Sequence, residues 1–91
     1  MATKQSLIEE GERLLGKVYE KDVFGIGSLV AVLPKDEMAH MREWVENLNI
    51  FLLTQAEAVR EEIQNLWLVN GERVAPERML HAIKILKSLP Q

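Results

Sequence analysis

Two histidines stand close to acidic residues and are the first candidates for chemistry. Glu37 and His40 are three residues apart, so on a helix both side chains share one face. Di-iron carboxylate bundles use this Glu-x-x-His spacing twice, together with single glutamates from two other helices. The second histidine, His81, instead follows Glu77 by four residues, which leaves that ligand set incomplete. A metal site needs about four matched ligands, so we predict no metal site and two histidines solvated beside acids.

Motifs for nucleophilic catalysis or phosphate binding are also incomplete. The serines Ser6, Ser28 and Ser88 lie outside any strand–turn–helix elbow, and no histidine stands near them in the sequence. Gly25 and Gly27 form a G-x-G, but the third glycine and the lysine of a phosphate-binding loop are missing. The chain has no cysteine, which excludes a thiol nucleophile, a disulfide framework and a thiolate zinc site. We therefore expect no catalytic residue, no cofactor and no enzymatic activity.

Length and composition describe one small domain over residues 1–91. Apolar residues make up 47% of the chain and charged residues 27%, which is typical of a folded protein. The net charge of −3 argues against a surface built to bind a polyanion. The longest uncharged stretch, 23–34, is too short to cross a bilayer, and Glu9 and Glu10 interrupt the apolar run that a signal peptide needs. We expect a cytoplasmic protein without membrane contact.

Start signals and apolar spacing predict four helices. Ser6 and Glu9 match a capping box, in which two side chains satisfy the free amides of the first turn. Pro34 and Pro76 each suit a first helical position, and acidic residues that complement the helix dipole follow them. The predicted helices span residues 6–20, 34–53, 54–69 and 76–89.

The segment 34–69 has two interpretations. Apolar residues recur at alternating spacings of three and four from Met38 to Leu52, which is a heptad pattern that continues weakly beyond. One long helix would extend well past a domain of this size. Thr54 and Glu57 match a second capping box, so a break near residues 53–54 is the alternative.

Two further segments leave alternatives open. Asn70 and Gly71 suit either a helix end or a hairpin before residues 73–74, and we favour the helix end because a lone hairpin is marginal in water. Residues 23–33 suit a buried strand, a short core helix or an exposed apolar segment. We favour an apolar connector with a short buried helix over 28–33, since a single strand has no partner here.

The predicted fold is all-α: a small up-down bundle of four to five helices, completed by oligomerisation. Residues 48–53 are apolar on nearly every side of a helix, and a small domain leaves much of its chain exposed. We therefore predict a non-catalytic interaction module that forms a homo-oligomer, binds a protein partner, or both. The predicted interaction face, the Met38–Leu53 face, comprises Met38, Met41, Trp44, Val45, Leu48, Phe51 and Leu52.

Two other functions compete with this prediction. A basic stripe on the last helix comprises Arg78, His81, Lys84 and Lys87. It would either contact nucleic acid or pair with acids of the preceding helix at Glu57, Glu61 or Glu62. We favour the pairing, because no aromatic side chains interleave the cations, and nucleic acid is not the expected partner. The second alternative is a small-molecule pocket at a subunit boundary, lined by Trp44, Phe51 and Trp67.

A scattered pattern of residues suggests a biological setting. It comprises Ile8-Glu9-Glu10-Gly11 with Leu14-Leu15, then Trp44, then Phe51-Leu52. The pattern resembles the helical leader regions of some bacterial proteins associated with phage defence and abortive infection, and it covers about the first 53 residues. The resemblance includes no catalytic motif, so it carries over no functional residue. It implies a docking or regulatory component of a bacterial or phage defence-related system.

Overall fold

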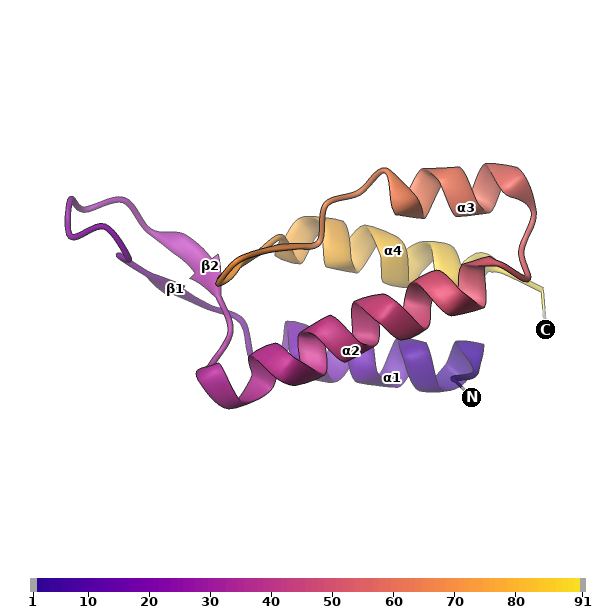
Figure 1. Cartoon of the computed structure of the whole chain (residues 1–91), viewed down its shortest axis with the longest axis horizontal. Coiled ribbons are helices and arrows are strands. Elements are labelled where there is room, and N and C mark those ends of the chain that lie inside the picture. The colour runs from indigo at the N-terminus through magenta and orange to yellow at the C-terminus, as the bar shows by residue number, and fades with distance from the viewer. Residues whose placement is uncertain (1, 91) are drawn as a thin grey trace.

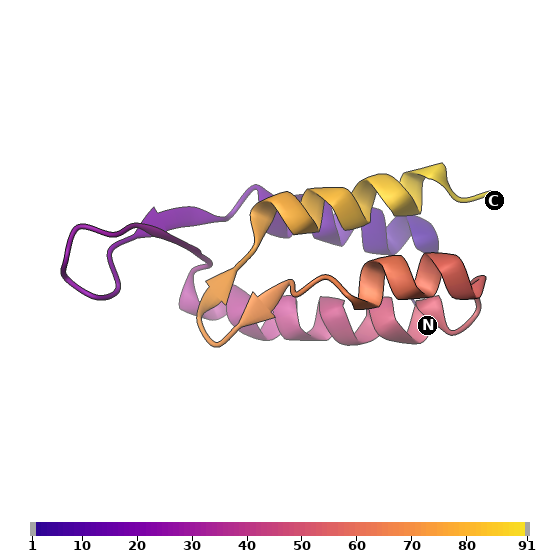
Figure 2. The same ribbon diagram turned by 90° about the horizontal axis from the view of Figure 1, so that it is seen from above.

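Three long helices lie along the long axis of the molecule in the computed structural model, which describes residues 2–90 (Figure 1). They are α1 (Lys4–Leu15), α2 (Lys35–Leu52) and α4 (Pro76–Ser88), and the short helix α3 (Glu57–Gln64) follows α2. Helix α1 packs against both α2 and α4, and α3 rests on α2. Figure 2 shows the same arrangement from above, with a hairpin projecting beyond one end of the helices. The principal extents are 44 × 23 × 18 Å, so the molecule is elongated.

A small antiparallel sheet lies at the hairpin end of the molecule, so the all-α prediction is wrong. Its strands are β1 (Tyr19–Lys21), β2 (Val30–Val32), β3 (Val69–Asn70) and β4 (Arg73–Val74), in the spatial order β1-β2-β4-β3. The pairs Tyr19↔Val32 and Lys21↔Val30 fix the first hairpin, and Val32↔Arg73 joins the two hairpins. The connector expected to hold a short helix at 28–33 is therefore partly a strand, because a partner exists.

The second hairpin overturns the predicted helix end at Asn70-Gly71. Asn70 pairs with Arg73, which leaves Gly71 and Glu72 as a two-residue turn. Gly71 is the first of these two residues, and its φ is +63°. A type II′ turn requires a positive φ at this position, and glycine adopts it without steric cost because it has no Cβ. A lone hairpin would be marginal, but β4 also pairs with β2.

Helix boundaries differ from the expected ones at several capping positions. The first helix begins at Lys4 with Thr3 as N-cap, and Thr3 and Ser6 form the capping box that was expected at Ser6 and Glu9. It ends at Leu15 rather than at residue 20, because residues 19–21 belong to β1. The helix over 34–69 is interrupted after Leu52, which agrees with the second interpretation of that segment. The next helix, α3, has Ala56 as its N-cap rather than Thr54. The Thr54 hydroxyl donates instead to the Phe51 carbonyl at 2.7 Å.

One hydrophobic core joins the helices. The most deeply buried large side chains come from α1, α2 and α4, with Ile63 added by α3: Leu7, Leu14, Met41, Trp44, Leu48, Leu52, Met79, Ile83 and Leu86. The indole Nε1 of Trp44 donates to the Leu7 carbonyl at 2.8 Å and so fixes the ring between α1 and α2. A Cβ at Gly11 would lie 2.7 Å from Trp44 Cζ2 and 3.1 Å from Ile83. The absence of a side chain at Gly11 therefore permits the close packing of three helices.

Candidate functional site: an apolar hairpin tip

The loop between β1 and β2 has a conformation fixed by hydrogen bonds and glycines. The Asp22 carboxylate accepts from the backbone N–H of Ile26 at 3.2 Å and of Gly27 at 2.7 Å. These backbone hydrogen bonds, the one from Gly27 above all, stabilise the ionised form and lower the pKa of Asp22. Gly25 and Gly27 have φ +69° and +82°, values that other residues rarely adopt. The loop is therefore held in shape by the Asp22 carboxylate and by its two glycines, although it projects from the body.

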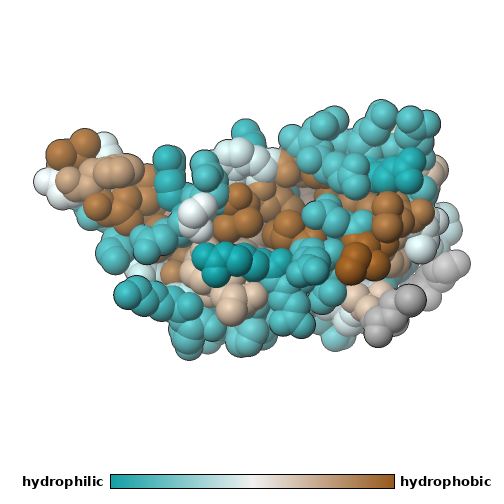
Figure 3. Space-filling view, viewed as in Figure 1, coloured by the Kyte–Doolittle hydropathy of each residue, from teal (hydrophilic) through white to brown (hydrophobic). Residues whose placement is uncertain are grey.

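Three large apolar side chains are exposed on this loop. Phe24 is 62% exposed, Ile26 75% and Leu29 61%, although burying a side chain of this kind stabilises by about 1.5–3 kcal/mol. We call these three residues the apolar tip. Figure 3 shows apolar surface on the projecting hairpin and a second apolar area over the body. Exposed apolar residues gathered on a fixed projection are typical of an interaction site.

The second apolar area lies near the C-terminal end of α2. Ile50 is 51% exposed and Leu53 is 66% exposed. A hollow of about 150 Å³ lies beside them, lined by Ala2, Asn47, Ile50, Phe51 and Thr54. This end of the molecule lies opposite the hairpin (Figure 1).

The structure places most of the predicted Met38–Leu53 face inside the protein. Five of its seven residues are buried, with exposed fractions of 7% or less: Met38, Met41, Trp44, Leu48 and Leu52. Val45 and Phe51 are partly buried and pack against the same core. The heptad pattern that suggested a partner helix is covered by helices of the same chain. The large apolar residues exposed here are instead Ile50 of α2 and Leu53, its C-cap residue, next to that pattern.

The basic stripe of α4 is largely engaged within the molecule. The Arg78 guanidinium lies 5.3 Å from the centre of the Trp67 ring. His81 Nε2 lies 3.4 Å from Glu62, and Lys87 Nζ lies 3.4 Å from Glu12. The sequence favours pairing with Glu57, Glu61 or Glu62 of the preceding helix, and of these three contacts only that of His81 with Glu62 matches this prediction. Lys84 lies exposed on the same helix.

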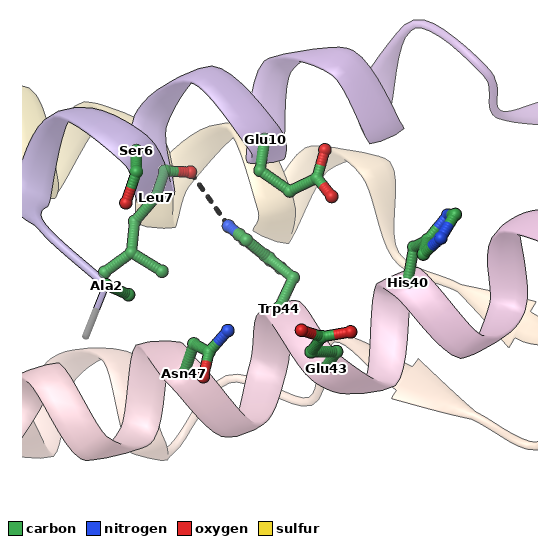
Figure 4. A pocket seen from close by; sticks show the side chains of 8 residues that line it. All are labelled: Ala2, Ser6, Leu7, Glu10, His40, Glu43, Trp44 and Asn47. Carbon is green, nitrogen blue, oxygen red and sulfur yellow. Dashed lines mark hydrogen bonds between the residues drawn. The ribbon is translucent and has the colours of Figure 1, made fainter.

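The three aromatic residues expected to share a pocket line different hollows. Trp44 lines a groove of about 640 Å³ between α1 and α2, Phe51 lines the hollow at the end of α2, and Trp67 lines a third of about 190 Å³ beside α3. In the groove, Glu10 from α1 and His40 and Glu43 from α2 lie around the Trp44 ring, whose N–H points at Leu7 (Figure 4). The indole is only 2% exposed, so it offers little surface to a ligand.

Glu37 and His40, the pair first considered for chemistry, form part of an ion-pair cluster. The Glu37 carboxylate accepts from Arg13 of α1 at 2.5 and 3.1 Å, and His40 Nδ1 lies 2.7 Å from its Oε1. Hydrogen bonds from Arg13 and then His40 lower the pKa of Glu37 to about 2. The hydrogen bond to Glu37 raises the pKa of His40. Within residues 2–90, no three His, Cys, Asp or Glu side chains are grouped as metal ligands. The cluster joins α1 to α2.

The apolar tip was missed because its sequence was interpreted as a connector. The signal for it is the uncharged stretch 23–34, which contains Gly25 and Gly27 and follows Asp22. An exposed apolar segment was one of the three interpretations of that stretch.

In the part of the chain that is described, no helix has both the length and the apolar character needed to cross a membrane.

Comparisons with known protein families, curated proteins and solved structures find no significant match. Some of the residues that carry the resemblance to defence-associated leader regions are buried in the core. They are Ile8, Gly11 and Leu14 of α1 and Trp44 of α2. The resemblance stays a prediction.

Proposed function

We propose that the protein is a non-catalytic protein–protein interaction module that binds its partner through the apolar tip. The observation that carries this proposal is the exposure, each above 60%, of Phe24, Ile26 and Leu29 on one loop. A partner with an apolar recess would remove these side chains from water and gain the hydrophobic stabilisation that the isolated protein forgoes.

The conformation of the loop supports binding at low entropic cost. Hydrogen bonds from Ile26 and Gly27 to Asp22 already fix the backbone before any contact forms. A preorganised loop loses less conformational freedom on association than a flexible one. Lys21 and Asp22 border the tip, which gives the surface an apolar centre and a polar rim.

Site-specific photo-crosslinking in cells of the source organism tests this function. A benzophenone amino acid at position 24 is expected to form a defined adduct with a protein. The same amino acid at position 84, an exposed site on α4, is the matched control and is expected to form none. Adducts with lipid alone, or equal adducts from both positions, would refute the proposed function.

A further inference from the structure

The two apolar areas of the molecule differ in shape. The apolar tip projects from one end, whereas the hollow of about 150 Å³ lies at the other end, beside Ile50 and Phe51. A groove of about 340 Å³ shares Phe51 with this hollow and extends along the start of α1 and the end of α4. We call the hollow and the groove together the end recess. Its lining includes Lys4 at the start of α1, Ile50 and Phe51 of α2, and Leu89 just after α4.

The hollow fits one aromatic ring. An apolar protein cavity of about 150 Å³ accommodates a benzene molecule, which is the ring of a phenylalanine side chain. Phe24 is the one aromatic residue of the apolar tip and is 62% exposed. The groove that continues from the hollow offers room for the neighbouring tip residues Ile26 and Leu29.

The charges of the two surfaces are complementary. Residues 22–29 include one acid, Asp22, and no base, whereas the end recess is lined by one cation, Lys4, and no acid. Helix α1 begins at Lys4, but α2 and α4 end at the same recess, so the helix dipoles there oppose one another and Lys4 is the charge that matters. The Lys4 ammonium donates to the Leu89 carbonyl at 2.9 Å, and contact between tip and recess would bring the Asp22 carboxylate toward it.

The exposed edge of β1 offers a different route to self-association, and its charges restrict the register of that route. A two-fold axis through Glu20 or Lys21 would set like charges face to face, and like charges directly opposite each other destabilise a strand pair. An axis midway between these residues sets Glu20 against Lys21 and is compatible with pairing. A dimer formed through this edge would survive changes to the tip and to the end recess, so the sedimentation of such variants distinguishes the two routes.

We propose that the partner of the apolar tip is the end recess of a second copy of this chain, so that copies associate head to tail. This inference rests on the proposed function and specifies its partner. Because tip and recess lie at opposite ends, each added copy leaves one tip and one recess free. Contacts of this heterologous kind extend into filaments unless the rotation closes a ring. The loop 22–29, which carries the apolar tip, has eight residues, which is few against the 20–30 residues that each side of a standard interface contributes, at about 800 Å² per partner. Association is therefore expected to be weak and to depend on concentration.

Sedimentation velocity over a wide concentration range tests the inference with two inactivating variants. Phe24→Ser removes the tip and keeps the recess. Ile50→Asp places a charge in the recess and keeps the tip, and Ile50 is 51% exposed, so the fold tolerates the change. The wild type is expected to grow beyond a dimer as concentration rises, and each variant alone is expected to stay monomeric.

A mixture of the two variants gives the sharpest outcome. The recess of Phe24→Ser accepts the tip of Ile50→Asp, so the mixture is expected to form a 1:1 dimer and nothing larger. The matched controls are Leu80→Asp and Leu80→Ser, at an exposed position on α4 outside the recess lining. Both controls are expected to assemble like the wild type.

Three results would overturn the inference. They are a wild type that is monomeric at every concentration, a dimer that survives both inactivating variants, and a mixture that remains monomeric. In each case, an adduct from position 24 with a different protein would leave the proposed function intact. The absence of any protein adduct from that position would refute both the proposed function and the head-to-tail association.

Discussion

Replacing Gly11 by alanine is expected to destabilise the protein, although alanine is the better helix former. The intrinsic gain on replacing glycine in a helix is about 1 kcal/mol. Against it, the new Cβ would lie 2.7 Å from Trp44 Cζ2, closer than real Cβ contacts allow, and 3.1 Å from two Ile83 atoms. Overpacking of this kind costs about 1–3 kcal/mol.

The structure places the cost of Gly11→Ala near the upper end of that range. The Trp44 ring is 2% exposed and its N–H is bound to the Leu7 carbonyl, so it cannot move aside without losing a buried hydrogen bond. We expect a net loss of about 1–2 kcal/mol in the free energy of unfolding. For a domain of this size that corresponds to roughly 4–16 °C in Tm.

Urea and thermal unfolding followed by far-ultraviolet circular dichroism measure this loss. The matched control is Gly16→Ala, where the nearest atom to a new Cβ is 3.5 Å away and φ is −69°. That control is expected to stabilise by about 0.4–1 kcal/mol through the unfolded state. In the Gly11→Ala background, Ile83→Val is expected to recover part of the loss by removing a clashing methyl group. A Gly11→Ala variant as stable as the wild type would refute the proposed close packing.

Three further changes test other parts of the structure. The pKa of Glu37 is about 2 when folded against an ordinary 4.5, so its contribution to stability is present above pH 4.5 and is lost as pH falls toward 2. The folded pKa of His40 lies above 6.5, so its contribution is present below pH 6.5 and is lost as pH rises through the folded value. Glu37→Gln is therefore expected to flatten the Tm–pH profile on both sides of pH 4.5–6.5; an unchanged profile would count against the cluster. Asp22→Ala is expected to speed amide hydrogen exchange at Gly27 with little change in Tm, and unchanged exchange would show that the carboxylate does not hold the loop. Leu48→Asp is expected to unfold the protein, since Leu48 is 1% exposed; a folded, soluble variant in circular dichroism would contradict its burial.

Local signals in the sequence carry most of the information about the helices. Pro34 followed by acids marks the start of α2, and Pro76 followed by Glu77 marks the start of α4, because both signals act within one helical turn. The strands depend on partners distant in the chain. Residues 19–21 are all exposed and show no alternation, so only their pairing with residues 30–32 identifies them as a strand.

The candidate site was harder to predict than the fold, for a related reason. Spacing shows that Met41, Leu48 and Leu52 share one side of a helix, but it does not show which surface covers that side. Here helices of the same chain cover it, α1 above all, together with α3, and the exposed apolar residues are elsewhere. Phe24 and Ile26 stand in a stretch whose composition suits a core equally well. Their exposure follows from a loop that projects past the helices, which is a property of the assembled structure (Figure 2).

The packing of α1 on α4 determines when the hydrophobic core can form during synthesis. Helix α1 is synthesised before α4, but a large part of its apolar face is covered by α4. Until α4 has left the ribosome, the side chains of Leu7 and Leu14 in a nascent chain lack part of the surface that buries them. The domain can therefore complete its core only after α4 emerges, and a chaperone that shields short apolar segments has a defined interval in which to act.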